Sequence, residues 1–285
     1  PVPNAIYDNT NKEIGTEYTP MAELQTNSTV NYQGMLYEFS GYTSTYKNTY
    51  KTGTTNYREP TLITGNNSDT SADVSSVSGN IYDASAGYYN TILGYTSAVN
   101  FGKDLQNQYN KMVESVAKYK GFYIGRYETA SETARTQASK DTVTAIKKEM
   151  NVYNWTNFET SKRLAEEFVN NEYVSSKICS SYVWDTTLEF LNLTGNSSYL
   201  TDSKQGNYSS YLNKTGATTA VQNIYDLGGN VGEWTSEICS DSEKQHTVRG
   251  GKFGENSNLQ PAINRQYSDS IKAENIGFRI VLFLK

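Results

Sequence analysis

Residues 223–235 read Asn-Ile-Tyr-Asp-Leu-Gly-Gly-Asn-Val-Gly-Glu-Trp-Thr, and they are the most informative stretch of the chain. Gly228, Gly229 and Gly232 can adopt positive φ angles, so the backbone can fold tightly around Asn230. Such a loop can aim carbonyl and carboxylate oxygens at one point, and calcium prefers hard oxygen ligands of this kind. From its spacing alone, the stretch is either a metal-binding loop or a glycine-rich turn between strands.

Two more blocks follow the first in order. Residues 249–251 read Arg-Gly-Gly, and residues 275–281 read Asn-Ile-Gly-Phe-Arg-Ile-Val. Together the three blocks resemble the formylglycine-generating enzyme (sulfatase-modifying factor) family, whose domain is a variant of the C-type lectin fold. Upstream, residues 121–128 (Gly-Phe-Tyr-Ile-Gly-Arg-Tyr-Glu) resemble the early strand of that family. Trp155 and the helix expected after it resemble the segment that leads into the central helices, so the resemblance covers residues near 105 to 285.

Three helices are expected in the middle of the chain. Over residues 104–118, Leu105, Tyr109, Met112, Val113 and Val116 recur with the helical period and form one apolar face. A second helix begins with a capping-box pattern formed by Thr156 and Glu159, and continues through Phe168. A third is expected near residues 181–191, where apolar residues again share one side.

The expected fold class is α+β, because helices in the middle of the chain precede short strands at its C-terminus. The resemblance implies a C-type lectin-like fold of the formylglycine-generating enzyme type, with short twisted strands, a few helices and long loops. Residues 1–100 are rich in Thr, Ser, Asn, Tyr and Gly, which indicates short strands and loops that pack into the same domain as residues 101–285. Residues 65–80 read either as a linker or as a solvated loop.

Composition limits the function classes. The 285 residues carry a net charge of -5 with dispersed Lys and Arg, so no basic stripe is available for nucleic acid. A mean hydropathy of -0.66 without a long apolar run excludes a membrane span, and the N-terminus lacks the charged and apolar pattern of a leader. The 24 Tyr among abundant Asn, Ser and Thr indicate either a contact surface or simply polar loops of an extracellular or phage-type protein. The expected location is a cell surface, the secreted fraction or a virion.

The cysteines do not fit the copper chemistry that the resemblance implies. Enzymes of the family oxidise a substrate cysteine with copper held by two cysteines just after the Arg-Gly-Gly block. Here residues 252–265 contain no cysteine, so a soft monovalent copper has no thiolate ligands there, and no redox metal is expected. Cys179 and Cys239 lie elsewhere and match no zinc or redox motif, so they are expected to be buried thiols or a pair.

The histidine content does not fit an iron site or a Ser-His-Asp arrangement either. A related branch of the family binds iron through several histidines, but this chain has a single histidine, His246. We expect His246 to be a solvated residue of a polar loop, since no cluster of partners accompanies it in the sequence. A Ser-His-Asp arrangement would need this same residue, and no nucleophile elbow is present. The chain is therefore predicted not to be an enzyme.

The resemblance also implies a structural calcium ion. Relatives bind calcium through positions that correspond to the side chains of Asp226 and Glu233 and the carbonyls of Gly229 and Val231. Mixed carboxylate and carbonyl oxygens suit this hard cation, which would tie the loop down.

Large side chains around the loop are expected to serve the fold. Trp155, Trp184 and Trp234 are predicted to pack in the core, because buried aromatic residues usually serve packing. Arg249 and Arg279 are predicted to donate hydrogen bonds to carbonyls or carboxylates inside the fold, a role that suits a planar fork of donors.

Residues 253–275 resemble, in position and composition, the variable region of proteins that diversity-generating retroelements diversify. In those proteins, mutagenised template adenines scatter asparagine codons into other residue types while the scaffold stays constant. Within the candidate variable loops of residues 236–275, Phe253 and Tyr267 would be rigid aromatic anchors, and polar residues would be adaptable contacts. The alternative is an ordinary solvated loop. The candidate ligand-binding residues are Phe253, Glu255, Asn256, Asn258, Gln260, Asn264, Gln266, Tyr267, Ser268, Asp269 and Ser270.

Three functions follow as hypotheses. The first is a non-enzymatic ligand-binding protein of the receptor or adhesion type, the variable protein of a diversity-generating retroelement, whose ligand is a protein or a cell-surface molecule. The second is a metal-dependent oxidase of the formylglycine-generating type or a degenerate relative of one. The third is an invariant surface or structural module without a specific ligand.

Overall fold

The computed structural model describes most of the chain from residue 121 onward together with a few earlier positions. The described residues are 2–3, 56–57, 112, 115–116, 118–119, 121–201, 205–218, 220–239, 246–255 and 262–285. Apart from two short strands, the predictions for residues 1–100, including the linker or loop at residues 65–80, lie outside the described residues.

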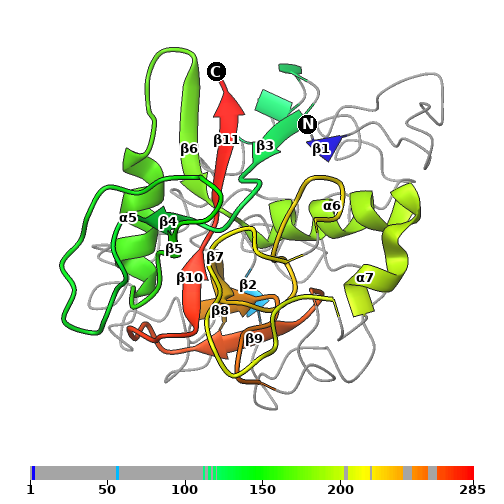
Figure 1. Ribbon diagram of the computed structural model, residues 1–285. Helices are drawn as coiled ribbons and strands as arrows, with labels where there is room; N and C mark the ends of the chain where they lie inside the picture. The colour runs from blue at the N-terminus through cyan, green and yellow to red at the C-terminus, as the bar shows by residue number, and fades with distance from the viewer. Residues whose placement is uncertain are drawn as a thin grey trace.

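One sheet is made of antiparallel strands in the order β1-β3-β11-β6 (Figure 1). Their bounds are Val2–Pro3 for β1, Gly121–Ile124 for β3, Ile280–Leu284 for β11 and Val174–Ile178 for β6. Successive side chains of a strand point to opposite faces. Accordingly, Ile280 and Val281 pack into two different core clusters, so both faces of this sheet are covered.

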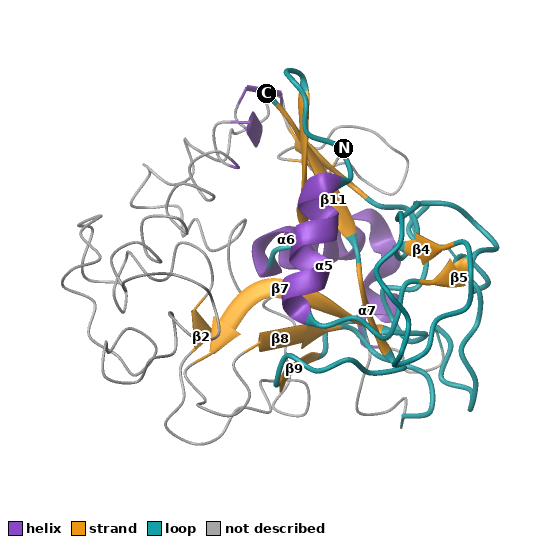
Figure 2. Cartoon of the chain, turned by 90° about the vertical axis from the view of Figure 1, so that its left-hand side faces the viewer, coloured by secondary structure: helices purple, strands orange, loops and turns teal. Residues whose placement is uncertain are grey.

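Helices cover the two faces of this sheet. Helix α5 (Phe158–Glu167) packs against one face, and α6 (Ser181–Leu191) has the predicted bounds and packs against the other. Figure 2 shows both helices at the centre of the described part, with β4 (Ala130–Ser131), β5 (Asn151–Val152) and long loops on one side. The α+β class is confirmed.

A kink follows α6. The π-helical turn η3 (Asn192–Asn196) contains Gly195 with φ of 82°, a conformation that glycine adopts without strain. This turn redirects the chain into the short helix α7 (Ser197–Thr201).

The predicted start of α5 is wrong by one residue. The N-cap is Asn157, whose Oδ1 accepts a hydrogen bond from Thr160 N at 3.1 Å. Thr156 was predicted to cap the helix, but its hydroxyl lies 3.0 Å from Ser161 Oγ instead. Both residue types cap helices well, and tertiary contacts decide between adjacent candidates.

The helix predicted over residues 104–118 is described only in part. Residues 112, 115, 116, 118 and 119 are helical, and Met112 and Val116 are buried as the apolar face requires. The predicted positions Leu105, Tyr109 and Val113 lie outside the described residues.

A second sheet has the order β10-β7-β8-β9, and β2 (Asn56–Tyr57) pairs with the far end of β7. β10 runs parallel to β7, and the other pairs are antiparallel. All four residues of β8 are buried, because this strand lies between β7 and β9. The bounds are Ile276–Phe278 for β10, Gly232–Cys239 for β7, His246–Arg249 for β8 and Arg265–Ser268 for β9.

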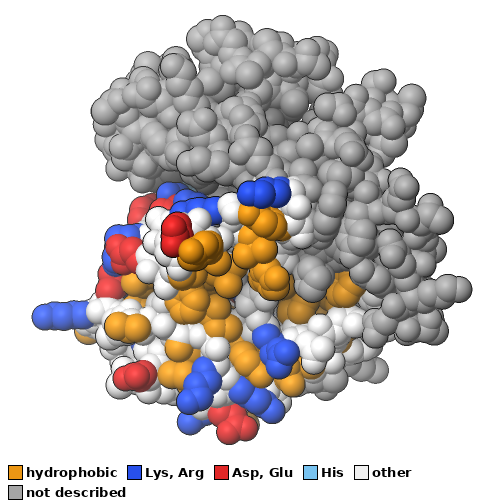
Figure 3. All heavy atoms as spheres, turned by 90° about the horizontal axis from the view of Figure 1, so that it is seen from above, with side chains coloured by type: hydrophobic (Ala, Val, Ile, Leu, Met, Phe, Trp, Pro, Cys, Tyr) orange, Lys and Arg blue, Asp and Glu red, His pale blue; other side chains and the backbone are white. Residues whose placement is uncertain are grey.

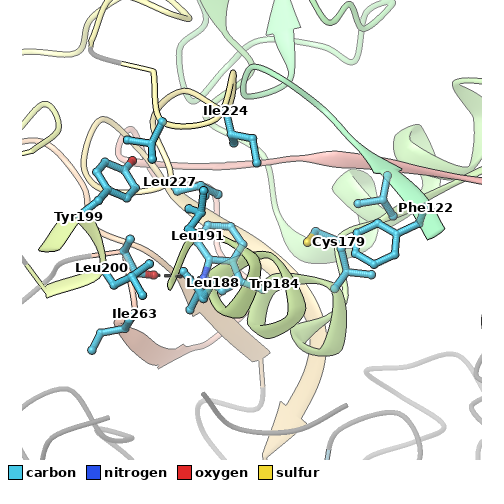
Figure 4. Packing of buried hydrophobic residues seen from close by; sticks show 14 of the residues in the cluster. Phe122, Cys179, Trp184, Leu188, Leu191, Tyr199, Leu200, Ile224, Leu227 and Ile263 are labelled. Atoms are coloured by element: carbon cyan, nitrogen blue, oxygen red, sulfur yellow. Dashed lines mark hydrogen bonds between the residues drawn. The ribbon is translucent and has the colours of Figure 1, made fainter. Parts of the chain in front are cut away.

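The larger core cluster lies between α6, α7 and the loops that follow them (Figure 4). Trp184 of α6 is its largest apolar side chain, and its Nε1 donates to Ala262 O at 3.1 Å. Leu188 and Leu191 continue the apolar face of α6 toward Leu227 of the glycine-rich loop. The glycine-rich loop thus packs against α6 through Leu227.

The second cluster surrounds Trp234 of β7. Its ring meets that of Phe158 edge-on at 6.5 Å, and its Nε1 donates to Thr156 O at 3.0 Å. The burial predicted for Trp184 and Trp234 is confirmed. Trp155 is only partly buried, so that prediction is wrong for this residue, whose backbone has a φ of 49°.

Among the described residues, no helix has the length and apolar character needed to cross a membrane. The face seen from above in Figure 3 carries apolar side chains interspersed with charged side chains of both signs. Among the described residues on that face, no stripe of a single charge is visible.

Candidate functional site

Asn230 is the centre of the loop that the sequence analysis singled out. Its backbone adopts φ of 61°, and its amide nitrogen donates to Asn207 O at 2.7 Å. Its Oδ1 accepts from Asn213 N and from Asn207 Nδ2, each at 2.9 Å, while its Nδ2 donates to Glu128 Oε2 at 2.7 Å. The tight turn predicted around Asn230 is confirmed, and one side chain joins four parts of the chain.

The positive φ angles predicted for Gly228, Gly229 and Gly232 are found at one of them. Only Gly229 of the three has a positive φ, 83°. A Cβ on Gly232 would lie 2.6 Å from Val248 Cγ1, and a Cβ on Gly228 would lie 3.1 Å from Gln205 O. Glycine suits these two positions because atoms of Val248 and Gln205 lie too close to leave room for a side chain.

Arg279 forms the main ion pair beneath the loop. Its Nε donates to Glu233 Oε2 at 2.9 Å, and one Nη donates to Glu233 Oε1 at 2.5 Å. The remaining donors reach Gly125 O at 2.8 Å and Tyr225 O at 2.9 Å. Both side chains of the pair are fully buried. The predicted structural role of Arg279 is confirmed.

Glu128 completes the network, and the sequence analysis did not identify its role. Its Oε1 accepts from Val231 N at 3.1 Å, in addition to the bond from Asn230. The available signal was its position as the last residue of the block at residues 121–128. We call Glu128, Asp226, Asn230, Glu233 and Arg279 the Asn230 frame.

The Asn230 frame buries three carboxyl groups and one guanidinium. Each carboxyl group belongs to a residue that is at most 1% exposed, and the guanidinium of Arg279 pairs with the carboxyl group of Glu233. Burial, followed by the charges of Asp226 and Glu233, raises the pKa of Glu128 well above its usual value. Burial also raises the pKa of Asp226 and of Glu233, although Arg279 opposes the shift for both. A cation at this place would relieve the repulsion.

The residues that the resemblance assigns to calcium are oxygen donors, and in this structure both carboxylates bond to protein groups. The assigned ligands are all oxygens, two from carboxylates and two from carbonyls. Asp226 accepts from Gly216 N at 3.0 Å and from the Thr218 hydroxyl, and Glu233 accepts from Arg279, so both carboxylates are already oriented by the protein. Within the described part of the chain, no group of three or more His, Cys, Asp or Glu side chains could hold a metal ion.

Arg249 lies in a second buried polar cluster. One Nη donates to Asp185 Oδ1 at 2.7 Å, and Nε donates to Asn264 O at 3.2 Å. Its guanidinium also lies 5.8 Å from the ring centroid of Trp184. The predicted structural role is confirmed, while its partner Asp185 was not predicted.

The prediction for His246 is wrong. It lies on β8, is fully buried, and stacks on Phe158 with ring centroids 4.3 Å apart. Trp234 meets it edge-on at 6.2 Å, and Glu159 Oε1 lies 3.6 Å from its Nε2. Burial lowers the pKa of His246 to about 3, so the imidazole is neutral near pH 7. Polar sequence neighbours gave no sign that a central strand would bury it.

The burial expected for the cysteines is confirmed for Cys179. Its side chain is fully buried, with Sγ 3.5 Å from Ser180 O. The side chain of Cys239 lies outside the described residues, although its backbone ends β7.

Residues 253–275, here called the candidate segment, combine strand and loop. The broader range of residues 236–275, predicted as loops, also includes the end of β7 and all of β8. In the candidate segment Glu255 is exposed, and the partly exposed positions include Phe253, Gln266, Ser268, Asp269 and Ser270. The side chains of Asn256, Asn258, Gln260 and Tyr267 lie outside the described residues.

Asn264 does not face solvent. It is 2% exposed, and its Nδ2 donates to Gly250 O at 3.3 Å. Gly250 N donates back to Asn264 O at 3.0 Å. Asn264 therefore anchors the candidate segment to the Arg-Gly-Gly block, which differs from the ligand contact predicted for it.

Ser270 anchors the other end. Its Oγ accepts from Phe158 N at 3.0 Å and donates to the Glu159 carboxylate. Together with Asn157, it satisfies first-turn groups of α5 that have no partner inside the helix. The candidate segment is thus fixed to a helix terminus.

Comparison with known families supports the resemblance read from the sequence. Residues 170–283 match the model of the sulfatase-modifying factor enzyme 1-like domain. This span contains the three C-terminal blocks, Asn230 and the candidate segment, and over these residues the chain is similar to that domain. The upstream block at residues 121–128 and Trp155 lie before it.

One solved structure is weakly similar to the chain. Among solved structures, Treponema denticola variable protein 1 is similar at 15% identity with a TM-score of 0.29. The similar region covers 38% of this chain and 47% of that one, so the chain spans less than half of that protein's length. No curated protein matches the chain.

Proposed function

We propose that this chain is a non-enzymatic ligand-binding protein of the receptor or adhesion type, whose C-type lectin scaffold displays the residues of the candidate segment. The observation that carries the proposal is the contrast within one continuous site. The Asn230 frame is buried and hydrogen-bonded, and Phe253, the first residue of the candidate segment, is bonded to it through Phe253 N and Asn230 O at 2.8 Å. Partly exposed side chains on a fixed backbone suit recognition.

The candidate segment is held at three points while other positions reach solvent. Phe253 N, Asn264 and Ser270 each bond to a different part of the scaffold. Between these points, Glu255, Gln266 and Asp269 are exposed or partly exposed. Substitutions at such positions leave the anchors in place, which is what a diversified surface requires.

We propose further that a diversity-generating retroelement varies this segment. The test is to sequence the 3′ end of the gene from many cells of one population, together with its flanking DNA. The expected result is a template repeat beside a reverse transcriptase, with substitutions concentrated in codons 253–270 and absent from Asn230 and Arg279. Substitutions spread evenly over the gene, with no template repeat, would remove this proposal.

The oxidase alternative has less support. Residues 252–265 contain no cysteine, and the single histidine is buried against Phe158. Oxygen consumption with a cysteine-containing peptide and added copper distinguishes this alternative, and we expect none above the protein-free rate.

The third hypothesis is an invariant surface module without a specific ligand. It predicts that replacing residues 253–270 leaves attachment unchanged.

Calcium is proposed as a structural ion at Asp226, Glu233 and the carbonyls of Gly229 and Val231. The three buried carboxyl groups of the Asn230 frame support the proposal, because a divalent cation would stabilise their charged form. Thermal unfolding after removal of divalent ions should occur at a lower temperature and recover with calcium more than with magnesium, as ligand binding to the native state requires. Equal unfolding temperatures in chelator and in millimolar calcium would exclude this role.

A further inference from the structure

Residues 207–211, here called the tyrosine loop, lie outside the candidate segment but beside it. Gly254 N donates to Ser209 O at 2.7 Å, directly after the residue whose amide bonds to Asn230. Figure 1 draws the tyrosine loop in yellow close to the β9 label. The hydrogen bond joins the two loops at this point, so their side chains can contact the same ligand.

Two side chains bond to the backbone of the tyrosine loop at Tyr211 O, namely Asn207 and Ser209. Asn207 is 5% exposed, and its Nδ2 donates to Tyr211 O at 3.0 Å and to Asn230 Oδ1 at 2.9 Å. Its Oδ1 accepts from Ser209 N at 3.1 Å and from Ser209 Oγ at 2.6 Å. The loop is therefore held by the Asn230 frame and does not depend on the candidate segment's side chains.

This rigid loop holds a large aromatic side chain in solvent. Tyr211 is 69% exposed, and Ser209 and Ser210 beside it are exposed. Tyr208 is half-buried, and a Cβ on Gly228 would lie 3.4 Å from its hydroxyl. A tyrosine on a fixed backbone loses little conformational entropy on binding, and Tyr with Ser is the composition of protein-binding surfaces.

Charged groups near the two loops have both signs. Lys252 and Glu255 lie 3.8 Å apart at the start of the candidate segment, and Lys214, three residues after Tyr211, is exposed. An exposed aromatic side chain with hydroxyl groups beside it suits the surface of a folded protein, because aromatic residues are enriched where proteins contact each other.

We infer that the tyrosine loop is a constant part of the ligand surface, with Tyr211 as its aromatic anchor, and that the ligand is a folded protein. This inference rests on the proposed display function. The diversified positions of the candidate segment would then select among protein ligands, while Tyr211 contributes binding energy to each complex.

A display experiment tests the inference without the natural ligand. The full chain is expressed on yeast with five positions randomised, and the library is selected for binding to hen egg-white lysozyme and, separately, to yeast mannan. The randomised positions are Phe253, Glu255, Gln266, Ser268 and Asp269. In the selected clones, Tyr211→Ala is compared with Tyr173→Ala, a matched control, since Tyr173 is 68% exposed and its backbone nitrogen is held by Asn171 Oδ1 at 2.9 Å.

The inference predicts lysozyme binders whose dissociation constant rises at least tenfold with Tyr211→Ala and less than twofold with Tyr173→Ala. Tyr211→Phe should keep most of the affinity, which separates the ring from general damage, and protease resistance of the displayed chain reports folding. Lysozyme binders unaffected by Tyr211→Ala would overturn the inference and leave the display function intact. Binders to mannan alone would exclude a protein ligand, and a library without any binders would contradict the display function itself.

Discussion

The Asn230 frame and the candidate segment are neighbours in space but differ in what holds them. In the frame, carboxylates accept hydrogen bonds from the Asn230 amide and the Arg279 guanidinium, out of contact with water. In the candidate segment, the bonds to the scaffold come mainly from the backbone and two anchoring side chains, Asn264 and Ser270. The difference indicates that the stability of the Asn230 frame depends on which side chains are present. The candidate segment depends mainly on the path of its backbone.

The largest expected effect comes from removing the cation of the frame. Arg279→Met leaves Glu128, Asp226 and Glu233 buried without a counter-charge, and breaking a buried pair in this way costs about 3–5 kcal/mol. Urea unfolding should show this loss or an unfolded chain. Arg163→Ala is the control, because Arg163 pairs with Glu167 and Asp141 at the surface and should cost at most about 1 kcal/mol. Similar losses for both variants would contradict the account.

Two glycines with similar backbone angles sharpen the comparison. Gly229 has φ of 83° and Gly254 has φ of 74°, so alanine at either position carries about 1–2 kcal/mol of left-handed strain. A Cβ on Gly229 would also lie 2.6 Å from Asn207 N, whereas a Cβ on Gly254 meets nothing within 4 Å. Gly229→Ala should therefore destabilise the protein by about 1–3 kcal/mol more than Gly254→Ala, which is the usual cost of overpacking. Chemical unfolding of both variants decides this.

Acid should weaken the fold through His246. The folded pKa of about 3 lies below the unfolded value of 6.5, so the unfolded chain takes up the proton first. The stability contribution is complete above pH 6.5 and is lost as pH falls toward 3. The raised carboxylate pKa values of the frame act in the opposite direction. Comparison with His246→Phe isolates the histidine.

Between pH 7 and pH 4.5, the wild type should lose about 2–3 kcal/mol relative to His246→Phe, at about 1.4 kcal/mol for each pKa unit. The free energy of unfolding of both proteins is measured by urea unfolding at several pH values. If it changes with pH equally in the two proteins, His246 does not titrate as a buried neutral group.

The smallest effect is expected where the candidate segment meets α5. Ser270→Ala removes the acceptor for Phe158 N and should cost about 1 kcal/mol, as loss of a helix cap does. Ser268→Ala, two residues earlier, should stay within about 0.5 kcal/mol, because its hydroxyl bonds only to the neighbouring Asp269 among the described residues. Thermal unfolding of the two variants compares an anchor with a displayed position, and a larger loss for Ser268→Ala would reverse this assignment.

Much of the scaffold could be predicted from local patterns. The bounds of α6 follow from apolar periodicity, and the turn around Asn230 follows from its glycines. Errors occurred where long-range packing decides. Asn157 rather than Thr156 caps α5, and the burial of His246 depends on strands from distant parts of the sequence.

The same limit applies to the candidate site. Glu128 joins Asn230 across 102 residues of sequence, so no local pattern could reveal that contact. Asn264 and Ser270 have the residue types of displayed polar contacts, but the three-dimensional structure uses them as anchors. Residue type predicted the character of the segment, and packing decided which positions face the solvent.

The central claim is that a side-chain-specific frame supports a segment whose displayed positions can change. The most direct measurement is a saturation mutagenesis scan of the full chain on yeast, read out as protease resistance. The account predicts that Glu128, Asn230, Glu233 and Arg279 tolerate almost no substitution, while Glu255, Gln266 and Asp269 accept most residue types. Equal tolerance in the two groups would contradict it.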